Sequence, residues 1–382
     1  MKKILAFLLL TALCLSLFAC SDTSNEKLPN TDQTDDQNNA EDEKVIEHKK
    51  YNLQDVTDSL KFLGRNTVAS NGIICDHSAS GIEFSAYIEG EVKLSASVSM
   101  RVTPAGAYEA NTYYTVYIDG IRQEKRFNVP SGEATIIIAN FEEGGVHNIR
   151  ILKQTESQNS LSILKSLEFT GYFEEAPAEK ELLIEFIGDS ITSGYGNLCI
   201  NGATNPGNAL NQDATQTYAY MTAEKLGADH SLVSYSGIGV AKGWPDFLME
   251  EFFAADSYCR NTSSAYEKSF TPDIVVINLG TNDHNKGASA TTFMNKAKGL
   301  ISLVRETYGD DVKIVWVYNM MGDSMQVFAT KAINSLGGKE NGLYICGLPR
   351  EQKGGGGHPS VAGHIAAADV LTQFIEDNVL TK

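Results

Sequence analysis

Basic side chains are scarce in this sequence relative to acidic ones. The chain of 382 residues has 31 Lys and Arg against 48 Asp and Glu, a formal net charge of −17. Nucleic acids and anionic lipid surfaces bind mainly through positive charge, so this deficit argues against either as the main partner. A neutral substrate fits such a chain, although solubility outside the cell explains the charge equally well.

A second long apolar run is also missing. The first follows Lys2 and Lys3 and covers residues 4–17, which is typical of an export signal and short for a membrane-spanning helix. It ends at 17–21, Leu-Phe-Ala-Cys-Ser, which resembles a bacterial lipobox. The resemblance implies cleavage before Cys20 and a lipid on its thiol. The mature protein would then be lipid-anchored at the bacterial cell surface or outer membrane, with no other membrane contact; a plain secretory signal is the alternative.

Cysteines are few, and their spacing matches no zinc site. With Cys14 removed and Cys20 lipidated, four remain: Cys75, Cys199, Cys259 and Cys346. Export permits disulfides, and Cys199 could pair with Cys259, but the spacing does not fix a pairing. Cys346 lies in an apolar run and is expected to be a buried thiol. The glycines 354–357 precede a histidine rather than Lys-Ser/Thr, so they form no phosphate loop. We predict no metal and no cofactor.

The length favours two domains with additional segments. Residues 1–20 are the signal, and 21–50 form a polar, acidic stretch that lacks the apolar surface to fold and suits a disordered tether. Residues 51–175 alternate with a period near two, as in 81–88, 92–98, 113–118 and 134–138, with turns predicted at 119–120 and 143–145. Many short strands without helices predict an all-β sandwich of the jelly-roll type.

From residue 181 to 382 the pattern changes to alternating strands and helices. Strands are predicted at 182–187, 231–235, 273–279, 313–319 and 342–347, and helices at 217–226, 244–254, 291–307, 325–336 and 360–379. Ser360 is the natural N-cap of the last helix. This order predicts an α/β domain of three layers with a parallel sheet.

Ser190 follows the first of these strands directly, in Gly188-Asp189-Ser190. The carboxyl ends of parallel strands are where open α/β sheets place active sites, so Ser190 is a candidate nucleophile whose own N–H could stabilise an oxyanion. Gly237, in a turn after the second strand, and Asn282, after the third, could supply further donors. Whether Gly237 or Gly239 gives the N–H stays open. His358, just before the last helix, is the candidate base.

This order of residues resembles the SGNH (GDSL-like) hydrolase superfamily, whose four blocks match Ser190, Gly237, Asn282 and His358. The α/β-hydrolase signature Gly-x-Ser-x-Gly is absent. Many SGNH members carry Asp three residues before the histidine, where this chain has Gly355. We therefore expect a Ser-His dyad whose imidazole is oriented by a main-chain carbonyl. A carboxylate from elsewhere, such as Glu351, is the alternative.

The chain as a whole resembles carbohydrate esterase family 2, which joins a jelly roll to an SGNH domain. The similar segments are 76–84 (DHSASGIEF), 278–283 (NLGTND) and 356–360 (GGHPS). The resemblance implies the removal of O-acetyl groups from acetylated polysaccharides such as xylan or glucomannan. In that family a main-chain carbonyl can replace the missing Asp.

Several neighbouring residues have simpler explanations than catalysis. Asp189 is expected to stabilise its turn, and Asp283 and His284 to cap a loop or border the cleft. Either tryptophan could stack on a sugar, although Trp316 lies in a strand and Trp244 does not. The remaining expectations are Tyr195 and Gly196 lining an acyl pocket, and His364 as a packing or surface histidine.

Two other functions remain open. One keeps the SGNH chemistry but acts on a lipid, a thioester or acetylated peptidoglycan; the lack of long apolar lid segments disfavours a lipid. The other is a non-catalytic glycan-binding lipoprotein built on the β sandwich, which would have no reason to retain Ser190, Asn282 and His358 together.

Overall fold

The computed structural model describes residues 44–103, 106–107, 111–199, 205–255 and 264–381. The signal, Cys20, Cys259 and most of the predicted tether lie outside these residues. No helix in the described part is long and apolar enough to cross a membrane.

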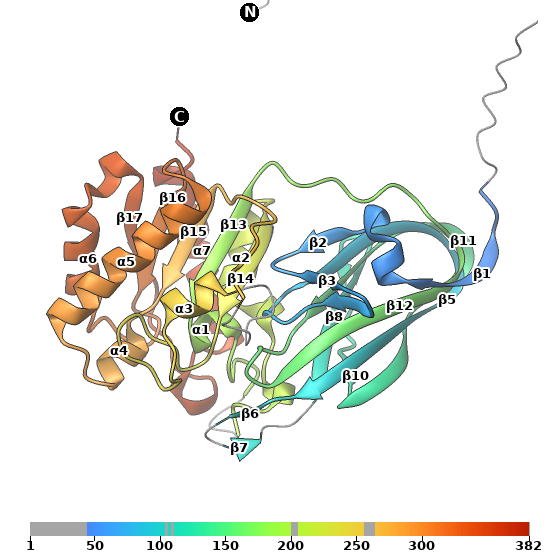
Figure 1. Ribbon diagram of the computed structural model, residues 1–382, viewed down its shortest axis with the longest axis horizontal. Helices are drawn as coiled ribbons and strands as arrows, with labels where there is room; N and C mark the ends of the chain where they lie inside the picture. The colour runs from blue at the N-terminus through green and yellow to red at the C-terminus, as the bar shows by residue number, and fades with distance from the viewer. Residues whose placement is uncertain (1–43, 104–105, 108–110, 200–204, 256–263, 382) are drawn as a thin grey trace, which may run out of the picture. The chain divides into compact units, whose positions relative to one another are not determined.

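The first part of the described chain is an antiparallel β sandwich (Figure 1). Its pairing order is β10-β8-β11-β5-β12-β4-β3, with β1 on β12, β2 on β5 and β9 on β8. The strands are β1 (Glu47–Asn52), β2 (Lys61–Leu63), β3 (Thr67–Ala69), β4 (Gly72–Ile74), β5 (Gly81–Met100), β8 (Thr112–Ile118), β9 (Ile121–Arg122), β10 (Phe127–Val129), β11 (Gly132–Lys153) and β12 (Ser160–Phe173), and a small hairpin is formed by β6 (Val102–Thr103) and β7 (Gly106–Ala107).

Two features of the sandwich differ from the prediction. Residues 47–50, assigned to the tether, belong to β1. This strand pairs with β12 through its backbone while its side chains stay largely exposed, so composition gave no signal for it. The predicted turn at 143–145 is instead a shift of register inside β11, which continues past it as one strand of 22 residues. By contrast, Asp119-Gly120 forms the predicted turn, with both residues at positive φ between β8 and β9.

The second part is built on a parallel sheet with the order β14-β13-β15-β16-β17. Its strands are β13 (Leu183–Gly188), β14 (Asp229–Ser234), β15 (Ile274–Asn278), β16 (Lys313–Tyr318) and β17 (Leu343–Gly347). Successive residues of β15 and β16 point alternately into two separate apolar cores. Both faces of the sheet are therefore covered, as parallel sheets require, and this confirms the predicted fold class.

Helices form the outer layers of this three-layer domain (Figure 1). One face is covered by α2 (Tyr218–Lys225) and α7 (Val361–Asn378), and the other by α3 (Met249–Ala254), α5 (Ala290–Tyr308) and α6 (Gln326–Ser335). The prediction of a helix from 244 was wrong by five residues at its start. Pro245 disfavours helical backbone at the residue before it, and Leu248 is extended (φ −110°, ψ 169°), so the helix begins only at Met249.

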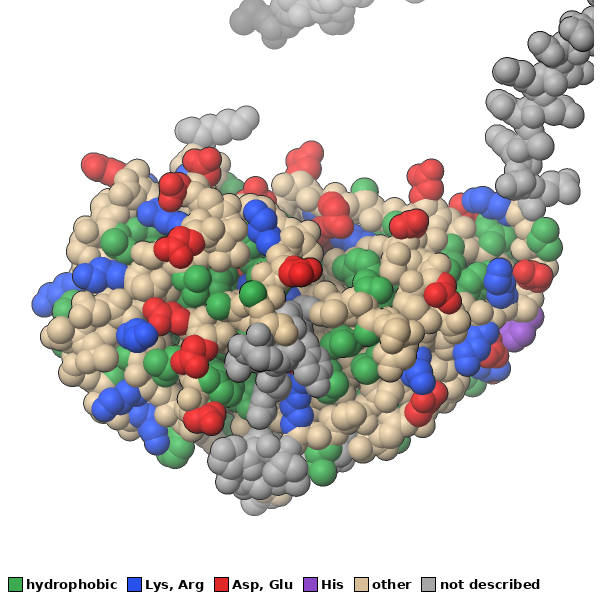
Figure 2. All heavy atoms as spheres, viewed as in Figure 1, with side chains coloured by type: hydrophobic (Ala, Val, Ile, Leu, Met, Phe, Trp, Pro, Cys, Tyr) green, Lys and Arg blue, Asp and Glu red, His purple; other side chains and the backbone are tan. Residues whose placement is uncertain are grey.

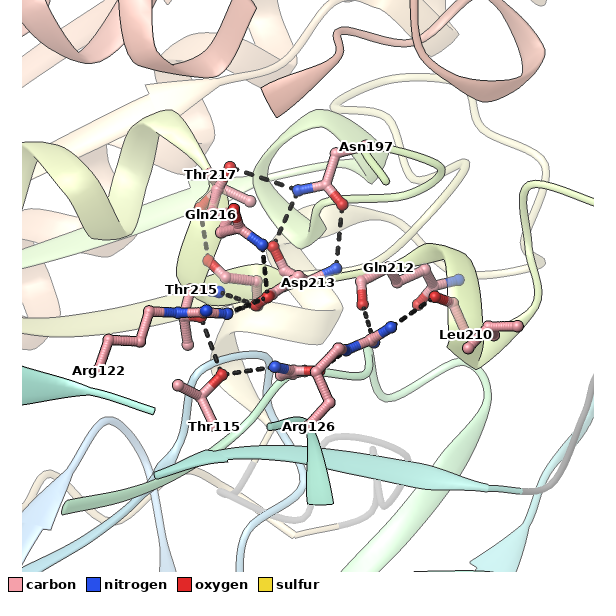
Figure 3. A network of polar contacts seen from close by, with 12 residues as sticks. Thr115, Arg122, Arg126, Asn197, Leu210, Gln212, Asp213, Thr215, Gln216 and Thr217 are labelled. Carbon is pink, nitrogen blue, oxygen red and sulfur yellow. Dashed lines mark hydrogen bonds and ion pairs between the residues drawn. The ribbon is translucent and has the colours of Figure 1, made fainter. Parts of the chain in front are cut away.

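Polar contacts join the sandwich to the α/β part. Arg65, in the loop after β2, is fully buried and binds both carboxylate oxygens of Glu185 on β13, at 3.0 and 3.2 Å. A second group of contacts reaches the segment before α2 (Figure 3). There Arg122 binds the Asp213 carboxylate at 2.7 Å, and Arg126 donates to the carbonyl of Gln212 at 2.8 Å.

Charged side chains of both signs are mixed over the face shown in Figure 2, without a continuous basic stretch on that face.

Candidate active site

The carboxyl end of β13 places Ser190 at the start of a one-turn helix, α1 (Ser190–Ser193). Asp189 is the N-cap of this turn, because its Oδ1 accepts the N–H of Ile191 at 3.0 Å. From β13 the chain adds β14 on one side of this strand and then β15 on its other side. Such a switch point in the strand order opens a crevice at the carboxyl ends of the strands. Ser190 lies at that crevice and is 8% exposed.

His358 lies directly against Ser190, although 168 residues separate them in sequence. Its Nε2 is 2.8 Å from Ser190 Oγ, and its Nδ1 is 3.1 Å from the carbonyl oxygen of Gly355. A carbonyl oxygen only accepts hydrogen bonds, so Nδ1 must carry the proton and Nε2 is left as the acceptor for the serine hydroxyl. Burial lowers the pKa of His358 below its usual 6.5, which favours this neutral form.

Glu351, the alternative orienter, is engaged elsewhere. Its carboxylate accepts the N–H of Ser360 at 2.7 Å and the hydroxyl of Ser360 at 3.0 Å. Ser360 in turn caps α7 by accepting the N–H of Gly363, as predicted for this helix. The structure thus puts a carbonyl, and not this carboxylate, on the imidazole.

The loop after Ser190 and the loop before His358 are bound to each other. The N–H of Gly355 donates to the carbonyl of Gly196 at 2.8 Å, and the N–H of Val361 donates to that of Asn197 at 3.2 Å. Tyr195 lies against the imidazole with the two rings 4.7 Å apart. Ser190 and His358 are therefore held in register by backbone contacts as well as by their own hydrogen bond.

Two backbone N–H groups border the site as candidate oxyanion donors, those of Ser190 and Gly237. Within the described part of the chain, neither has an acceptor from the protein. Gly237 has a φ of +84°, a conformation that favours glycine, and lines the same cleft as Ser190. Gly239 does not line this cleft, and a Cβ there would lie 1.9 Å from the carbonyl oxygen of Lys242. The geometry therefore favours Gly237 over Gly239.

Asn282 lies on a second short helix, α4 (Thr281–Asn285), at the end of β15. Its amide nitrogen donates to Asp189 Oδ2 at 3.1 Å and to the carbonyl of Ile238 at 2.9 Å. The amide thus ties together the loops after β13, β14 and β15. Burial raises the pKa of Asp189 to about 7. Asp189 caps the turn that carries Ser190 and accepts from Asn282, in keeping with the structural role expected for it.

The cleft over these groups has a volume of about 380 Å³. Its lining includes residues that the sequence did not suggest: Gln158, Pro206, Asn285 and Met321. A second cavity of about 300 Å³ shares Thr281, Asn285 and Met321 with it and extends past His284 to Arg350. Gln158, Pro206, Asn285 and Met321 lie in no recognisable motif, so only the folded chain reveals them.

The remaining candidates fall into simple roles. Trp244 is 66% exposed and lines the cleft, whereas Trp316 is 1% exposed in the core. Asp283 is a loop cap: its carboxylate accepts the N–H groups of residues 240, 241 and 242, and burial raises its pKa. His364 is buried, and its Nδ1 accepts the N–H of Tyr218.

One of the two cysteine expectations, that for Cys346, concerns a described residue alone. Cys346 is buried, as expected from its apolar run, and burial raises its pKa to about 12. The pairing of Cys199 with Cys259 falls on a residue outside the described part. Among the described residues, no group of three or more His, Cys, Asp or Glu side chains is arranged to hold a metal ion.

Two family models match adjoining parts of the chain. Residues 62–177 match the carbohydrate esterase 2 N-terminal family, and residues 186–365 match the GDSL-like Lipase/Acylhydrolase family. The pairing of these two domains, on the fold described above, decides the assignment. The chain belongs to carbohydrate esterase family 2.

Named relatives agree with this family. The chain is 29% identical over 328 residues to "Cellulase/esterase CelE" of Acetivibrio thermocellus, covering 81% of this chain and 38% of the relative. It is 26% identical over 196 residues to an "Acetylxylan esterase / glucomannan deacetylase" of Cellvibrio japonicus, covering 48% of this chain and 53% of the relative. The chain thus spans about half or less of the length of these curated relatives.

Among solved structures, the chain is similar to a family two carbohydrate esterase from Clostridium thermocellum in complex with cellohexaose. The TM-score is 0.73 at 26% identity, and the match covers 83% of this chain and 98% of that one. The likeness extends over both the sandwich and the parallel sheet, so the predicted family 2 architecture is confirmed.

Proposed function

We propose that this chain is a serine esterase that removes O-acetyl groups from a polysaccharide such as xylan or glucomannan. The observation that carries the proposal is the contact of His358 Nε2 with Ser190 Oγ at 2.8 Å, with the other ring nitrogen held by the Gly355 carbonyl. A base and a nucleophile in this geometry can form and break an acyl-enzyme.

In the proposed reaction, His358 takes the proton from Ser190 as Oγ attacks the acetyl carbonyl carbon. The carbonyl oxygen becomes an oxyanion, stabilised by the N–H groups of Ser190 and Gly237 and by the amide of Asn282. The protonated imidazole then gives its proton to the sugar oxygen, which leaves as a hydroxyl while Ser190 keeps the acetyl group. Water, deprotonated by His358, then attacks the acetyl carbon; acetate is released as the bond to Ser190 Oγ breaks, and the imidazolium returns its proton to Oγ.

The amide of Asn282 would donate to the oxyanion through a hydrogen that already bonds a protein acceptor. Its nitrogen has two hydrogens and two protein acceptors, Asp189 and Ile238. The longer bond, to Asp189 at 3.1 Å, is the one that an oxyanion in the cleft can most readily share. The bond to Ile238 would then keep the side chain in place during the reaction.

A polysaccharide substrate is supported by the cleft and by the relatives. The exposed ring of Trp244 lies at the cleft edge, where a sugar ring can stack on the part of it that Lys286 Nζ, 3.9 Å from the ring centroid, leaves uncovered. The second cavity beside the cleft provides room for more than the acetylated sugar. The named relatives include an acetylxylan esterase / glucomannan deacetylase, and a similar structure holds cellohexaose.

Acetate release from a panel of acetylated glycans tests the proposal. The full chain should release acetate from acetylated xylan or glucomannan, while Ser190→Ala should release none and should still bind the glycan. Faster turnover of acyl lipids, thioesters or acetylated peptidoglycan would mean that the proposed catalytic mechanism holds but that the substrate is not an acetylated polysaccharide. Binding of glycan without any hydrolysis, even of 4-nitrophenyl acetate, would favour the non-catalytic binding protein instead.

We also propose that the mature protein is exported and lipid-anchored through Cys20. The support is the segment 17–21 at the end of the only long apolar run of the sequence. In cell fractionation, the wild-type chain should be found with membranes, and Cys20→Ser should be released or left unprocessed. Unchanged membrane association and processing of Cys20→Ser would contradict the anchor.

A further inference from the structure

A loop of the β sandwich reaches the candidate oxyanion site of the α/β part. It connects β11 to β12 and carries Glu156, which is completely buried. Glu156 Oε2 accepts the N–H of Ser236 at 3.0 Å, and Oε1 accepts the Ser236 hydroxyl at 2.8 Å. Ser236 immediately precedes Gly237, the candidate oxyanion donor. Both oxygens of one carboxylate therefore hold the residue next to that donor.

The carboxylate is also bound by a second segment, the one that precedes α2. Gln212 donates from Nε2 to Glu156 Oε1 at 3.3 Å and accepts the N–H of Glu156 through Oε1 at 3.4 Å. The backbone of Gln212 is in turn bound by Arg126 of the sandwich (Figure 3). Glu156 is thus fixed between two segments and is not free to follow Ser236 if that turn moves.

Packing alone does not explain a carboxyl group at this position. Burial disfavours its charged form and raises the pKa of Glu156 to about 7, so the group is retained at a cost in solvation. The nearest cation is Lys153, which donates to the carbonyls of Asp76 and Ser160 at 2.8 Å each. An apolar side chain would avoid that cost but would leave the Ser236 N–H without an acceptor.

We propose that Glu156 is a positioning residue of the esterase: by binding Ser236 through both oxygens, it fixes the direction of the Gly237 N–H toward the oxyanion. The sandwich is then part of the catalytic apparatus. This inference rests on the proposed function. Glu156 does not line the cleft, and its carboxylate binds Ser236 and also the side chain of Ser193 on α1, so its loss should lower kcat and leave KM nearly unchanged.

Three variants of the full chain test this role with 4-nitrophenyl acetate as substrate. Glu156→Ala removes both acceptors and should lower kcat about tenfold or more, with KM within about twofold, as expected for a misdirected oxyanion donor. Glu156→Gln keeps one acceptor for the Ser236 N–H, and the Ser236 hydroxyl can turn to accept from the new amide; kcat should stay within about threefold of wild type. Ser236→Ala removes one of the two bonds and should give an intermediate loss of kcat.

A matched control separates positioning from general loosening of the contact between the two parts. Lys61 is also buried there and binds Asp229, at the opposite end of β14, at 2.7 Å. Lys61→Met should lower the melting temperature and leave kcat unchanged. If Glu156→Ala does not fold, Ser236→Ala carries the test, because it removes only a hydroxyl.

The outcomes distinguish this inference from the proposed function. Wild-type turnover that Ser190→Ala abolishes, together with unchanged kcat in folded Glu156→Ala or Ser236→Ala, would overturn the positioning role alone. So would a loss confined to KM, or a Glu156→Gln variant as slow as Glu156→Ala. If the wild type has no turnover that depends on Ser190, the proposed function fails and this inference fails with it.

Discussion

At the scale of single residues, the position where many SGNH enzymes have Asp is occupied by Gly355 for a steric reason. A Cβ at Gly355 would lie 2.6 Å from Cys199 Sγ and 2.6 Å from Pro206 Cβ. No side chain fits there without moving both neighbours. The sequence showed that the carboxylate is missing and predicted a carbonyl in its place. It could not show that the packing around Gly355 leaves no room for an acidic side chain.

The pH dependence of kcat/KM should reflect this carbonyl-oriented base. The reaction needs neutral His358, and neutral imidazole dominates above its pKa, so activity should rise with pH through the titration of His358. Because burial holds this pKa below 6.5, the rise should be centred below 6.5. A carboxylate on the ring would stabilise the imidazolium and move the midpoint above 6.5. A midpoint there would contradict the dyad.

The alternative orienter can be removed separately. Glu351→Gln should change kcat by less than about threefold, because its carboxylate binds Ser360 and not the imidazole. His358→Ala should remove nearly all activity. A large loss of kcat in folded Glu351→Gln would show that a carboxylate assists the base after all.

Asn282→Ala tests the third oxyanion donor. Its kcat should fall roughly a hundredfold or more, with a much smaller change in KM, as for the loss of one such donor. The amide also binds Asp189 and Ile238, so a thermal melt must accompany the kinetics to establish that the variant is folded. If the change is confined to KM, Asn282 contributes to substrate binding and not to the oxyanion site.

At the scale of elements, long apolar strands and amphipathic helices were predictable, and short functional ones were not. The predicted strands of the parallel sheet lie within two residues of the observed bounds at either end, because buried parallel strands are continuous apolar runs. The helices α1 and α4 were missed, since segments of four and five residues carry no helical periodicity. These two helices carry Ser190 and Asn282, so the local geometry of the candidate site required the structure.

The N-cap of α7 was predictable and gives a test at this scale. Ser360 caps the helix that follows His358 and is also bound by Glu351. Ser360→Ala should lower the free energy of unfolding by about 1 kcal/mol, the usual effect of losing such a cap. Denaturation in urea measures this, with Ser360→Thr as the control that keeps a hydroxyl. Equal stability of Ser360→Ala and wild type would mean that the cap does not stabilise α7.

At the scale of the whole molecule, the sequence predicted two domains but did not indicate which residues join them. Glu156 and Arg65 come from polar or irregular stretches of the sandwich and bind partners far along the chain, and Gln158 of the same sandwich lines the cleft. Such meetings depend on tertiary packing and leave no local pattern. Ser190 and His358 were found because each belongs to a motif next to a regular element, whereas Glu156 belongs to none.

The buried pair of Arg65 with Glu185 should make the two parts unfold together. Arg65→Met would leave the Glu185 carboxylate buried without its cation, which typically costs about 3–5 kcal/mol. Lys165→Met, at an exposed pair with Glu133, is the control and should change stability by less than about 0.5 kcal/mol. Thermal or urea unfolding of both variants gives the comparison. If Arg65→Met loses no more stability than the control, the Arg65–Glu185 pair does not stabilise the contact between the sandwich and the α/β part.

Covalent labelling of Ser190 tests the central claim most directly. A serine-directed organophosphate should react with the wild-type chain at one site, and peptide mass spectrometry should locate the adduct on Ser190. Labelling should disappear in Ser190→Ala and fall sharply in His358→Ala, because the base activates the hydroxyl. A loss of turnover in Ser190→Ala and His358→Ala that parallels the loss of labelling would support the assignment of Ser190 as the nucleophile. An adduct on a different serine, or esterase turnover that persists in Ser190→Ala, would contradict it.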